Sequence, residues 1–269
     1  MPIHFSWINK FDSDLKGLYH RTFTSHVIGK KIGYGIYIPE ELMGEHMRVP
    51  VLYWLHGKGG NESIGPNLKI PQIINNALLK KKVKPFIAVF VNGASFSMYC
   101  DSYDKKIPVE SYIVNDLIPH IDHTYATLAN HRSIEGFSMG GFGALRLALK
   151  FWKIFESVLT YGGSFHDLES VSKNRPEVFQ RMFSNHNSYF QENSPYVIAK
   201  NNARFLKNHL RIRTVVGSND FTLENNEKIW NLLDRLGIGY EKILIPNTEH
   251  DCRPYYEKEG LNGFRFHFQ

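Results

Sequence analysis

Short, nearly continuous apolar runs alternate with segments of helical periodicity along most of this 269-residue chain. Strands that are buried on both faces have this apolar character, and their alternation with helices is typical of a mostly parallel sheet flanked by helices. The pattern therefore predicts an α/β fold. The expected strands cover residues 33–38, 51–55, 86–91, 133–135, 157–161, 213–216 and 240–245.

Between these strands, apolar residues recur at helical spacing over residues 113–121, 144–151 and 229–236. Pro119 should kink the first of these helices, because proline lacks a backbone N–H group. The pattern is irregular from about 165 to 210, and a structureless loop of that length is uncommon. We therefore expect one domain over residues 1–269, with short helices at about 165–210 that form a small partial lid.

The charge pattern gives no sign of a nucleic-acid or membrane surface. Lys and Arg outnumber Asp and Glu by 32 to 26, and the densest basic run, at 80–84, lacks interleaved aromatic residues and is typical of a solvated helix end. No apolar run approaches the roughly 20 residues of a spanning helix, and residues 1–7 do not resemble a signal peptide. We expect a cytoplasmic chain without nucleic-acid or membrane partners; homo-oligomerisation stays open.

Residues 136–140 have the form G-x-S-x-G between a short strand and a helical segment. Glycines permit a strained turn that presents the Ser138 hydroxyl at a helix N-terminus. A glycine-rich turn in which the serine only caps the helix would have the same sequence pattern. A second glycine-rich turn, at 56–60, follows an apolar strand where α/β-hydrolases place an oxyanion-hole amide. We therefore expect an α/β-hydrolase fold, with the backbone N–H groups of Lys58 and Met139 as oxyanion donors.

Downstream of the serine, the sequence supplies an acid and a base in the order that this fold requires. Asp220 follows the strand at 213–216 and can orient the base imidazole, although it could instead cap the next helix. His250 follows the strand at 240–245 and is the expected general base. His56 precedes the nucleophile, so we expect it to be structural.

Other chemistry is weakly supported by the sequence. His120 and His123 have a spacing that metals can use, but no third ligand follows, so solvated helix surface is favoured. The glycines at 57–60 lack the G-K-[ST] of a phosphate loop. We expect no metal site and no bound nucleotide.

The chain resembles the esterase family that includes feruloyl and acetyl-xylan esterases, S-formylglutathione hydrolase (esterase D) and the mycolyltransferases. The matching stretches run in family order through nearly the whole chain: 53–60, 117–122, 136–145, 193–196, 217–220 and 250–251. The resemblance implies an α/β-hydrolase core, the same Ser138, Asp220 and His250, and no metal or organic cofactor. It also implies that residues 92–101 line the substrate pocket. The pocket residues expected are Gly57, Phe96, Tyr99, Cys100 and Asp101.

Three positions depart from the family pattern. The formylglutathione branch usually has a cysteine in the turn at 58–60, and its absence makes that activity less favoured. A tryptophan that often follows the catalytic histidine is replaced by residues 252–256. Glu135 stands where a small apolar residue is usual, and the sequence offers no explanation.

The two cysteines, Cys100 and Cys252, are too few for a disulfide scaffold and are expected to be reduced. The two thiols would be near neighbours if residues 92–101 line the substrate site and the residues after His250 contact that segment at the mouth of the site. Two unrelated buried thiols are the favoured interpretation, because cysteine is among the most often buried residue types.

These residues predict hydrolysis of a small-molecule carboxylic ester through an acyl-enzyme, in the manner of feruloyl and acetyl esterases. An acyltransferase that uses a bound alcohol in place of water and a thioesterase of the S-formylglutathione type stay open. The difference between hydrolysis and transfer lies in how a pocket excludes water. A binding protein without activity is disfavoured, because every expected catalytic residue is present.

Overall fold

The computed structural model describes residues 5–42 and 47–268. Within them, an eight-stranded sheet has the order β1-β2-β4-β3-β5-β6-β7-β8. Pairs from β4 to β8 are parallel, whereas β1–β2 and β2–β4 are antiparallel. The strands are β1 (Leu18–Ser25), β2 (Lys30–Tyr37), β3 (Val49–Leu55), β4 (Ile87–Val91), β5 (Thr127–Phe137), β6 (Ser157–Tyr161), β7 (Arg211–Gly217) and β8 (Glu241–Ile245). The predicted, mostly parallel α/β sheet is confirmed.

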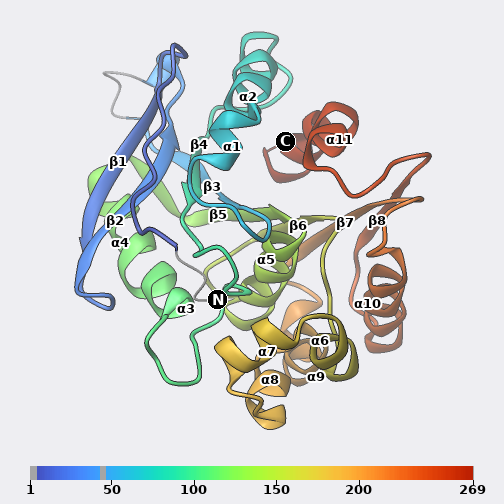
Figure 1. The fold of residues 1–269 in the computed structure, drawn as a ribbon. Coiled ribbons are helices and arrows are strands. Elements are labelled where there is room, and N and C mark those ends of the chain that lie inside the picture. Colours follow the sequence, from blue (N-terminus) through green and yellow to red (C-terminus); the bar gives the residue numbers. More distant parts are fainter. Residues whose placement is uncertain (1–4, 43–46, 269) are drawn as a thin grey trace.

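Helices cover both faces of this sheet, with α2 and α11 on one side and α5 and α6 to α10 on the other (Figure 1). Side chains of β3 alternate between the two layers, as a pleated strand requires: Tyr53 packs on one side and Trp54 on the other. The helical segments are η1 (Glu40–Leu42), α1 (Ile64–Asn67), α2 (Ile70–Leu79), α3 (Val109–Tyr112), η2 (Ile113–Leu117), α4 (Ile118–Thr124), α5 (Met139–Lys150), α6 (Leu168–Asn174), α7 (Pro176–Phe183), α8 (Asn187–Glu192), α9 (Pro195–Leu206), α10 (Leu223–Leu236) and α11 (Cys252–Phe268).

All seven expected strands are present, most with slightly different bounds, and one more strand was not expected. β1 lies at the edge of the sheet and includes polar residues, so it lacks the apolar run that marks the inner strands. The predicted kink at Pro119 takes another form. A π-helical turn, η2, runs directly into α4, and Pro119 is the second residue of α4.

The segment from about 165 to 210 holds four helices, α6 to α9, between β6 and β7. Aromatic rings of Phe179, Phe183 and Phe190 pack against one another and hold α7 to α8. The division into one domain with a lid, made from the sequence, stays a prediction. Every helix in the described ranges is too short or too polar to cross a bilayer.

Candidate active site

The parallel strands end at one edge of the sheet, and the glycine-rich turn after β5 lies there. Ser138 has φ 58° and ψ −116°, a strained conformation for a residue with a side chain. A Cβ atom on Gly140 would lie 2.1 Å from the carbonyl oxygen of Leu55, and one on Gly136 would lie 2.4 Å from the backbone of Gly140. Only glycine therefore fits on either side of Ser138, and the turn has the form that the motif predicts.

Three residues from distant parts of the sequence meet at this edge. Nε2 of His250 lies 2.8 Å from Oγ of Ser138, although 112 positions separate the two residues. Nδ1 of His250 lies 2.7 Å from Oδ2 of Asp220. The structure thus brings together the serine, the histidine and the acid in the expected order.

Asp220 is only 4% exposed, and each of its oxygens has several donors. Oδ1 accepts hydrogen bonds from the backbone N–H and the hydroxyl of Thr222, at 2.7 and 2.6 Å, and so braces the start of α10. Burial raises the pKa of Asp220, but hydrogen bonds from His250, Thr222 and Tyr255 outweigh burial and hold the pKa below its ordinary value. The carboxylate is therefore ionised beside the imidazole at neutral pH.

Tyr255 is a member of this site that the sequence analysis missed. Its hydroxyl donates to Oδ2 of Asp220 at 2.5 Å and accepts the N–H of Gly217 at 2.7 Å. It comes from the first turns of α11, in the stretch where the family tryptophan is absent. The absence of the family tryptophan from residues 252–256 was the one sequence feature that pointed to this stretch. It did not indicate which of these residues contacts Asp220.

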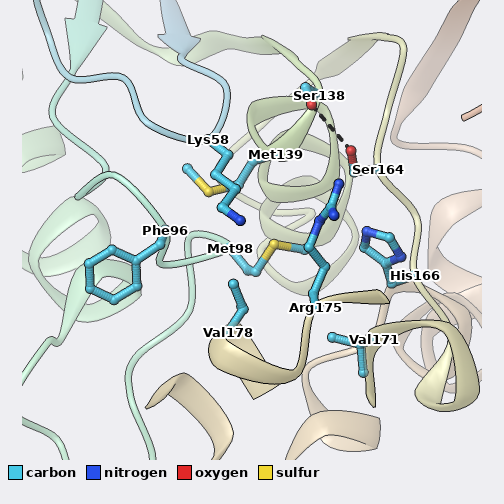
Figure 2. A pocket seen from close by; sticks show the side chains of 10 residues that line it. All are labelled: Lys58, Phe96, Met98, Ser138, Met139, Ser164, His166, Val171, Arg175 and Val178. Atoms are coloured by element: carbon cyan, nitrogen blue, oxygen red, sulfur yellow. Dashed lines mark hydrogen bonds between the residues drawn. The ribbon is translucent and has the colours of Figure 1, made fainter. Parts of the chain in front are cut away.

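A hollow of about 380 Å³, measured with the solvent at its mouth, opens beside Ser138 (Figure 2). Oγ of Ser164 lies 3.2 Å from Oγ of Ser138 at one end of it. The hollow, called the first hollow below, is lined by Lys58, Phe96, Met98, Ser138, Met139, Ser164, His166, Val171, Arg175 and Val178. Of the expected pocket residues, Phe96 lines it, and the segment between β6 and β7 supplies five lining residues that were not expected from the sequence.

Tyr99, Cys100 and Asp101 do not line the first hollow, in contrast to the expectation. Met98 and Tyr99 have φ values of 54° and 55°, and after this turn Met98 lines the hollow while Tyr99 is fully buried behind it. The Tyr99 hydroxyl donates to the carbonyl oxygen of His56 at 3.0 Å. The Asp101 carboxylate accepts the backbone N–H and the hydroxyl of Ser111, at 2.9 and 2.6 Å. These side chains support the loop from behind.

A second hollow lies on the histidine side of the site. Gly57, which was expected in the substrate pocket, lines this second hollow together with Phe137, His250 and Cys252. Lys58 borders both hollows. Ser138 lines the first hollow and His250 lines the second, so the hydrogen bond between these residues lies where the two hollows meet.

The two expected oxyanion residues, Lys58 and Met139, both border the first hollow with Ser138. Met139 is the first residue of α5, where backbone N–H groups have no intrahelical acceptor. Among the described residues, none accepts a hydrogen bond from the N–H of Lys58, whereas Gly59 and Gly60 donate theirs to Ser95 and Gly57. Both N–H groups are thus available to a ligand.

Comparison with known proteins shows the family and the fold of the chain. The sequence profile of the family described as "Putative esterase" matches residues 25–268. The chain belongs to that family. An endo-1,4-beta-xylanase/feruloyl esterase of Xylanibacter ruminicola is 33% identical over 138 residues, which are 48% of this chain and 19% of the relative. This esterase-family chain therefore spans less than a fifth of that relative's length.

Two further comparisons cover most of the chain. An acetyl esterase of Caldicellulosiruptor saccharolyticus is 23% identical over 228 residues, or 80% of this chain and 82% of the relative. A solved ferulic acid esterase has a TM-score of 0.80 at 18% identity and covers 93% of this chain and 97% of its own. At that identity the structural likeness concerns the fold, and it agrees with the expected α/β-hydrolase architecture.

His56 has the structural role expected of it in this esterase-family chain. Its ring is fully buried, with Nδ1 2.8 Å from the carbonyl oxygen of Gly57 and Nε2 accepting the N–H of Gly93 at 2.9 Å. Burial lowers the pKa of His56 to about 4, so the ring is neutral at pH 7. It links the turn at 56–60 to the loop after β4.

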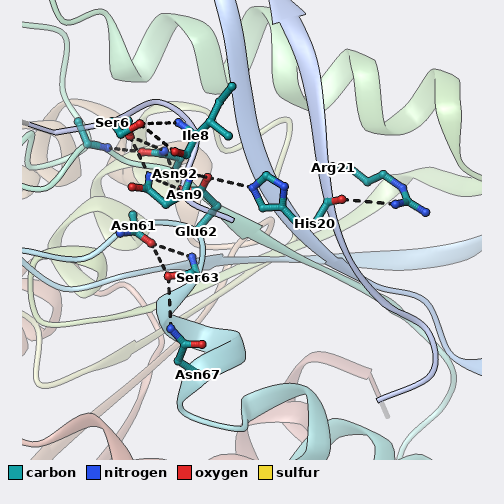
Figure 3. A network of polar contacts seen from close by, with 11 residues as sticks. Ser6, Ile8, Asn9, His20, Arg21, Asn61, Glu62, Ser63, Asn67 and Asn92 are labelled. Atoms are coloured by element: carbon teal, nitrogen blue, oxygen red, sulfur yellow. Dashed lines mark hydrogen bonds and ion pairs between the residues drawn. The ribbon is translucent and has the colours of Figure 1, made fainter. Parts of the chain in front are cut away.

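A buried carboxylate, Glu62, fixes the same two loops (Figure 3). It accepts the backbone N–H of Asn9 at 2.6 Å, the side-chain amides of Asn9 and Asn92 at 2.9 and 2.8 Å, and lies 3.3 Å from Nε2 of His20. A buried charge is tolerated when its oxygens are satisfied in this way. The network ties the segment before β1 to the loops that supply Lys58 and Phe96.

Glu135, unexplained by the sequence, lies at the contact between β5 and α11. It is fully buried, accepts the hydroxyl of Tyr256 at 2.7 Å and lies 3.5 Å from Nε2 of His267. The same Tyr256 hydroxyl accepts the indole N–H of Trp54 at 2.6 Å. The residue therefore holds α11 against the strand that leads to Ser138.

The remaining candidates have structural roles. His120 stacks on Phe23, with ring centroids 4.7 Å apart, so it is partly buried rather than solvated, whereas His123 is exposed. Cys100 and Cys252 pack in different clusters, one on each side of the sheet, in agreement with two unrelated buried thiols. No group of His, Cys, Asp and Glu within the described ranges could hold a metal ion.

Proposed function

We propose that this chain hydrolyses a carboxylic ester through an acyl-enzyme, with Ser138 as nucleophile, His250 as general base and Asp220 as the residue that orients it. The observation that carries the proposal is the continuous set of hydrogen bonds from Ser138 through His250 to Asp220, placed at a strained turn. A nucleophile within hydrogen-bond reach of a base that a third group orients is typical of nucleophilic catalysis. Relatives named as feruloyl and acetyl esterases support the same class of substrate.

In the proposed reaction, Nε2 of His250 takes the proton of the Ser138 hydroxyl as Oγ attacks the ester carbonyl. The N–H groups of Lys58 and Met139 bind the developing oxyanion. His250 then gives the proton to the leaving alcohol, and water, activated by His250, releases the acid. Asp220 stabilises the imidazolium, and Tyr255 holds Asp220.

The two hollows take different parts of the ester in this reaction. The leaving oxygen must receive a proton from His250, so the alcohol lies in the second hollow, which His250 lines. The acyl group then occupies the first hollow, which contains Ser138 and both oxyanion residues but not His250. A small acyl group suits that narrow space.

The test replaces the nucleophile. Ser138→Ala should lower kcat/KM for p-nitrophenyl acetate and methyl ferulate by about 10⁴-fold or more, with an unchanged thermal unfolding midpoint. A fluorophosphonate probe should label the parent at Ser138 alone, as peptide mass spectrometry would detect. Ser172→Ala, which removes an exposed hydroxyl on α6, is the matched control and should keep full activity. Full activity in the Ser138 variant would overturn the proposal.

A further inference from the structure

A cationic side chain lies in the first hollow without a carboxylate partner. Arg175, the residue before α7, lines the hollow, and its guanidinium group points toward the end that holds Ser138 and Ser164 (Figure 2). Its side chain donates to the carbonyl oxygen of Asn174 at 3.0 Å, and no described carboxylate lies within 4.0 Å of it. A guanidinium stays charged and carries five N–H donors, most of which are free here.

The other charges at the hollow leave this one uncompensated. Nζ of Lys58 pairs with Glu177 of α7 at 2.8 Å, so that this pair carries no net charge. None of the residues that line the hollow is acidic. The lining of the proposed acyl site therefore has two cations, Lys58 and Arg175, and the Glu177 carboxylate outside the lining balances only one of these charges.

His166 is a second polar residue in the lining of the hollow. The residue is 7% exposed and lines the same hollow, and its Nδ1 has no hydrogen-bond partner among the described residues. Burial, with the positive charges of Arg175 and Lys58, lowers the pKa of His166 to about 4, so the ring is neutral at pH 7.

Apolar side chains complete the hollow. Met98, Val171 and Val178 line it together with Phe96. Such a wall favours methylene groups between the ester carbon and a polar end. A short apolar chain that ends in an anion matches both parts of the lining.

We propose that the acyl group of the natural substrate ends in a carboxylate, so that the enzyme cleaves monoesters of short dicarboxylic acids. Arg175 binds the distal carboxylate through paired N–H groups. Water and the monoester give the dicarboxylic acid and the alcohol. This assignment rests on the proposed ester hydrolysis and on the placement of the acyl group in the first hollow.

The test compares three ethyl esters of similar length. Monoethyl succinate carries the carboxylate, ethyl succinamate replaces it by a neutral amide, and ethyl butanoate is apolar. Each kcat/KM is divided by the rate constant of alkaline hydrolysis, which removes differences in intrinsic reactivity. The parent enzyme should prefer the monoester by about 10- to 100-fold, the range that charge-assisted hydrogen bonds support.

Three variants then test whether Arg175 causes the preference for monoethyl succinate. Arg175→Gln should remove the 10- to 100-fold advantage of monoethyl succinate over ethyl butanoate, and Arg175→Lys should keep part of the advantage. Lys173→Gln removes an equal charge from the exposed side of α6 and should change nothing. Succinate should slow fluorophosphonate labelling of Ser138 in the parent but not in Arg175→Gln.

The possible results separate the two proposals. Equal cleavage of all three esters, an equal loss on all three in Arg175→Gln, or a preference for methyl ferulate that Arg175→Gln leaves intact would overturn the dicarboxylate assignment while the esterase proposal stands. An active parent whose labelling succinate does not slow would also overturn it. Failure of every ester together with absence of labelling at Ser138 would overturn the esterase proposal itself.

Discussion

The hydroxyl of Tyr255 donates a hydrogen bond to Oδ2 of Asp220, the oxygen that also faces Nδ1 of His250. The tyrosine is buried and belongs to α11, whereas the acid follows β7. Because the same hydroxyl accepts the N–H of Gly217, it fixes the acid relative to the end of its own strand. Tyr255 is thus a positioning residue for the proposed base, without contact to substrate.

Tyr255→Phe should lower kcat by about tenfold and leave KM nearly unchanged, because it removes one hydrogen bond to a charged group that orients His250. The pH–rate profile and the KM-against-kcat split measure this. Tyr37→Phe, which removes a hydroxyl bonded to Asn75 away from the site, is the matched control. A normal kcat in Tyr255→Phe, or an equal loss in both variants, would contradict the positioning role.

Gly140→Ala should destabilise the protein by at least about 3 kcal/mol or prevent folding, because its Cβ would strike the carbonyl oxygen of Leu55. Gly239→Ala adds the same methyl group where no atom lies within 4 Å, and it should have little effect. Urea unfolding monitored by tryptophan fluorescence gives both values. Similar stabilities would show that the turn has room for a side chain.

His56 should make stability fall in mild acid. Its folded pKa of about 4 is below the ordinary 6.5, so the unfolded chain binds a proton first, and stability present above pH 6.5 is lost as the pH falls toward 4. The full loss is about 3 kcal/mol at 1.36 kcal/mol per pH unit. His56→Gln should reduce the pH dependence of urea unfolding between pH 6.5 and 4 and leave the part that His166 contributes. An unchanged slope would rule out this source.

Both thiols should resist modification in the folded protein. Burial raises the pKa of Cys100 to about 12 and that of Cys252 further still, and only the thiolate attacks the usual reagents. A thiol-specific chromogenic reagent at pH 8 should therefore release no colour from native enzyme and two equivalents after denaturation. Rapid reaction of Cys252 in native enzyme would show that the start of α11 opens.

The parallel part of the fold was predictable because strands such as Val49–Leu55 are buried along nearly their whole length. β1 was not predicted, since an edge strand can be half polar and still be held by one neighbour. The π-helical turn before Pro119 was also missed. Periodicity locates a helical segment, but it does not resolve where an extra residue is inserted before a proline.

The site was predictable where a local pattern forces geometry. The glycines around Ser138 have that property, and so have the strand ends before Asp220 and His250. Tyr255 and Arg175 were not predictable, because their roles depend on how α11 and α7 pack against distant segments. The side chains of Tyr99 and Cys100 point away from the hollow because two successive residues, Met98 and Tyr99, have positive φ angles. Such angles are rare for residues other than glycine and cannot be predicted from these residue types.

β8 and α11 come last in the described chain, yet His250 and Tyr255 lie just after β8 and in the first turns of α11. A polypeptide that has reached only β7 already contains Ser138 and both glycine-rich turns, but it lacks His250, the proposed base. If His250 is the base, as proposed, a chain that ends before residues 250–255 is inactive, and activity arises only when these last segments have been made.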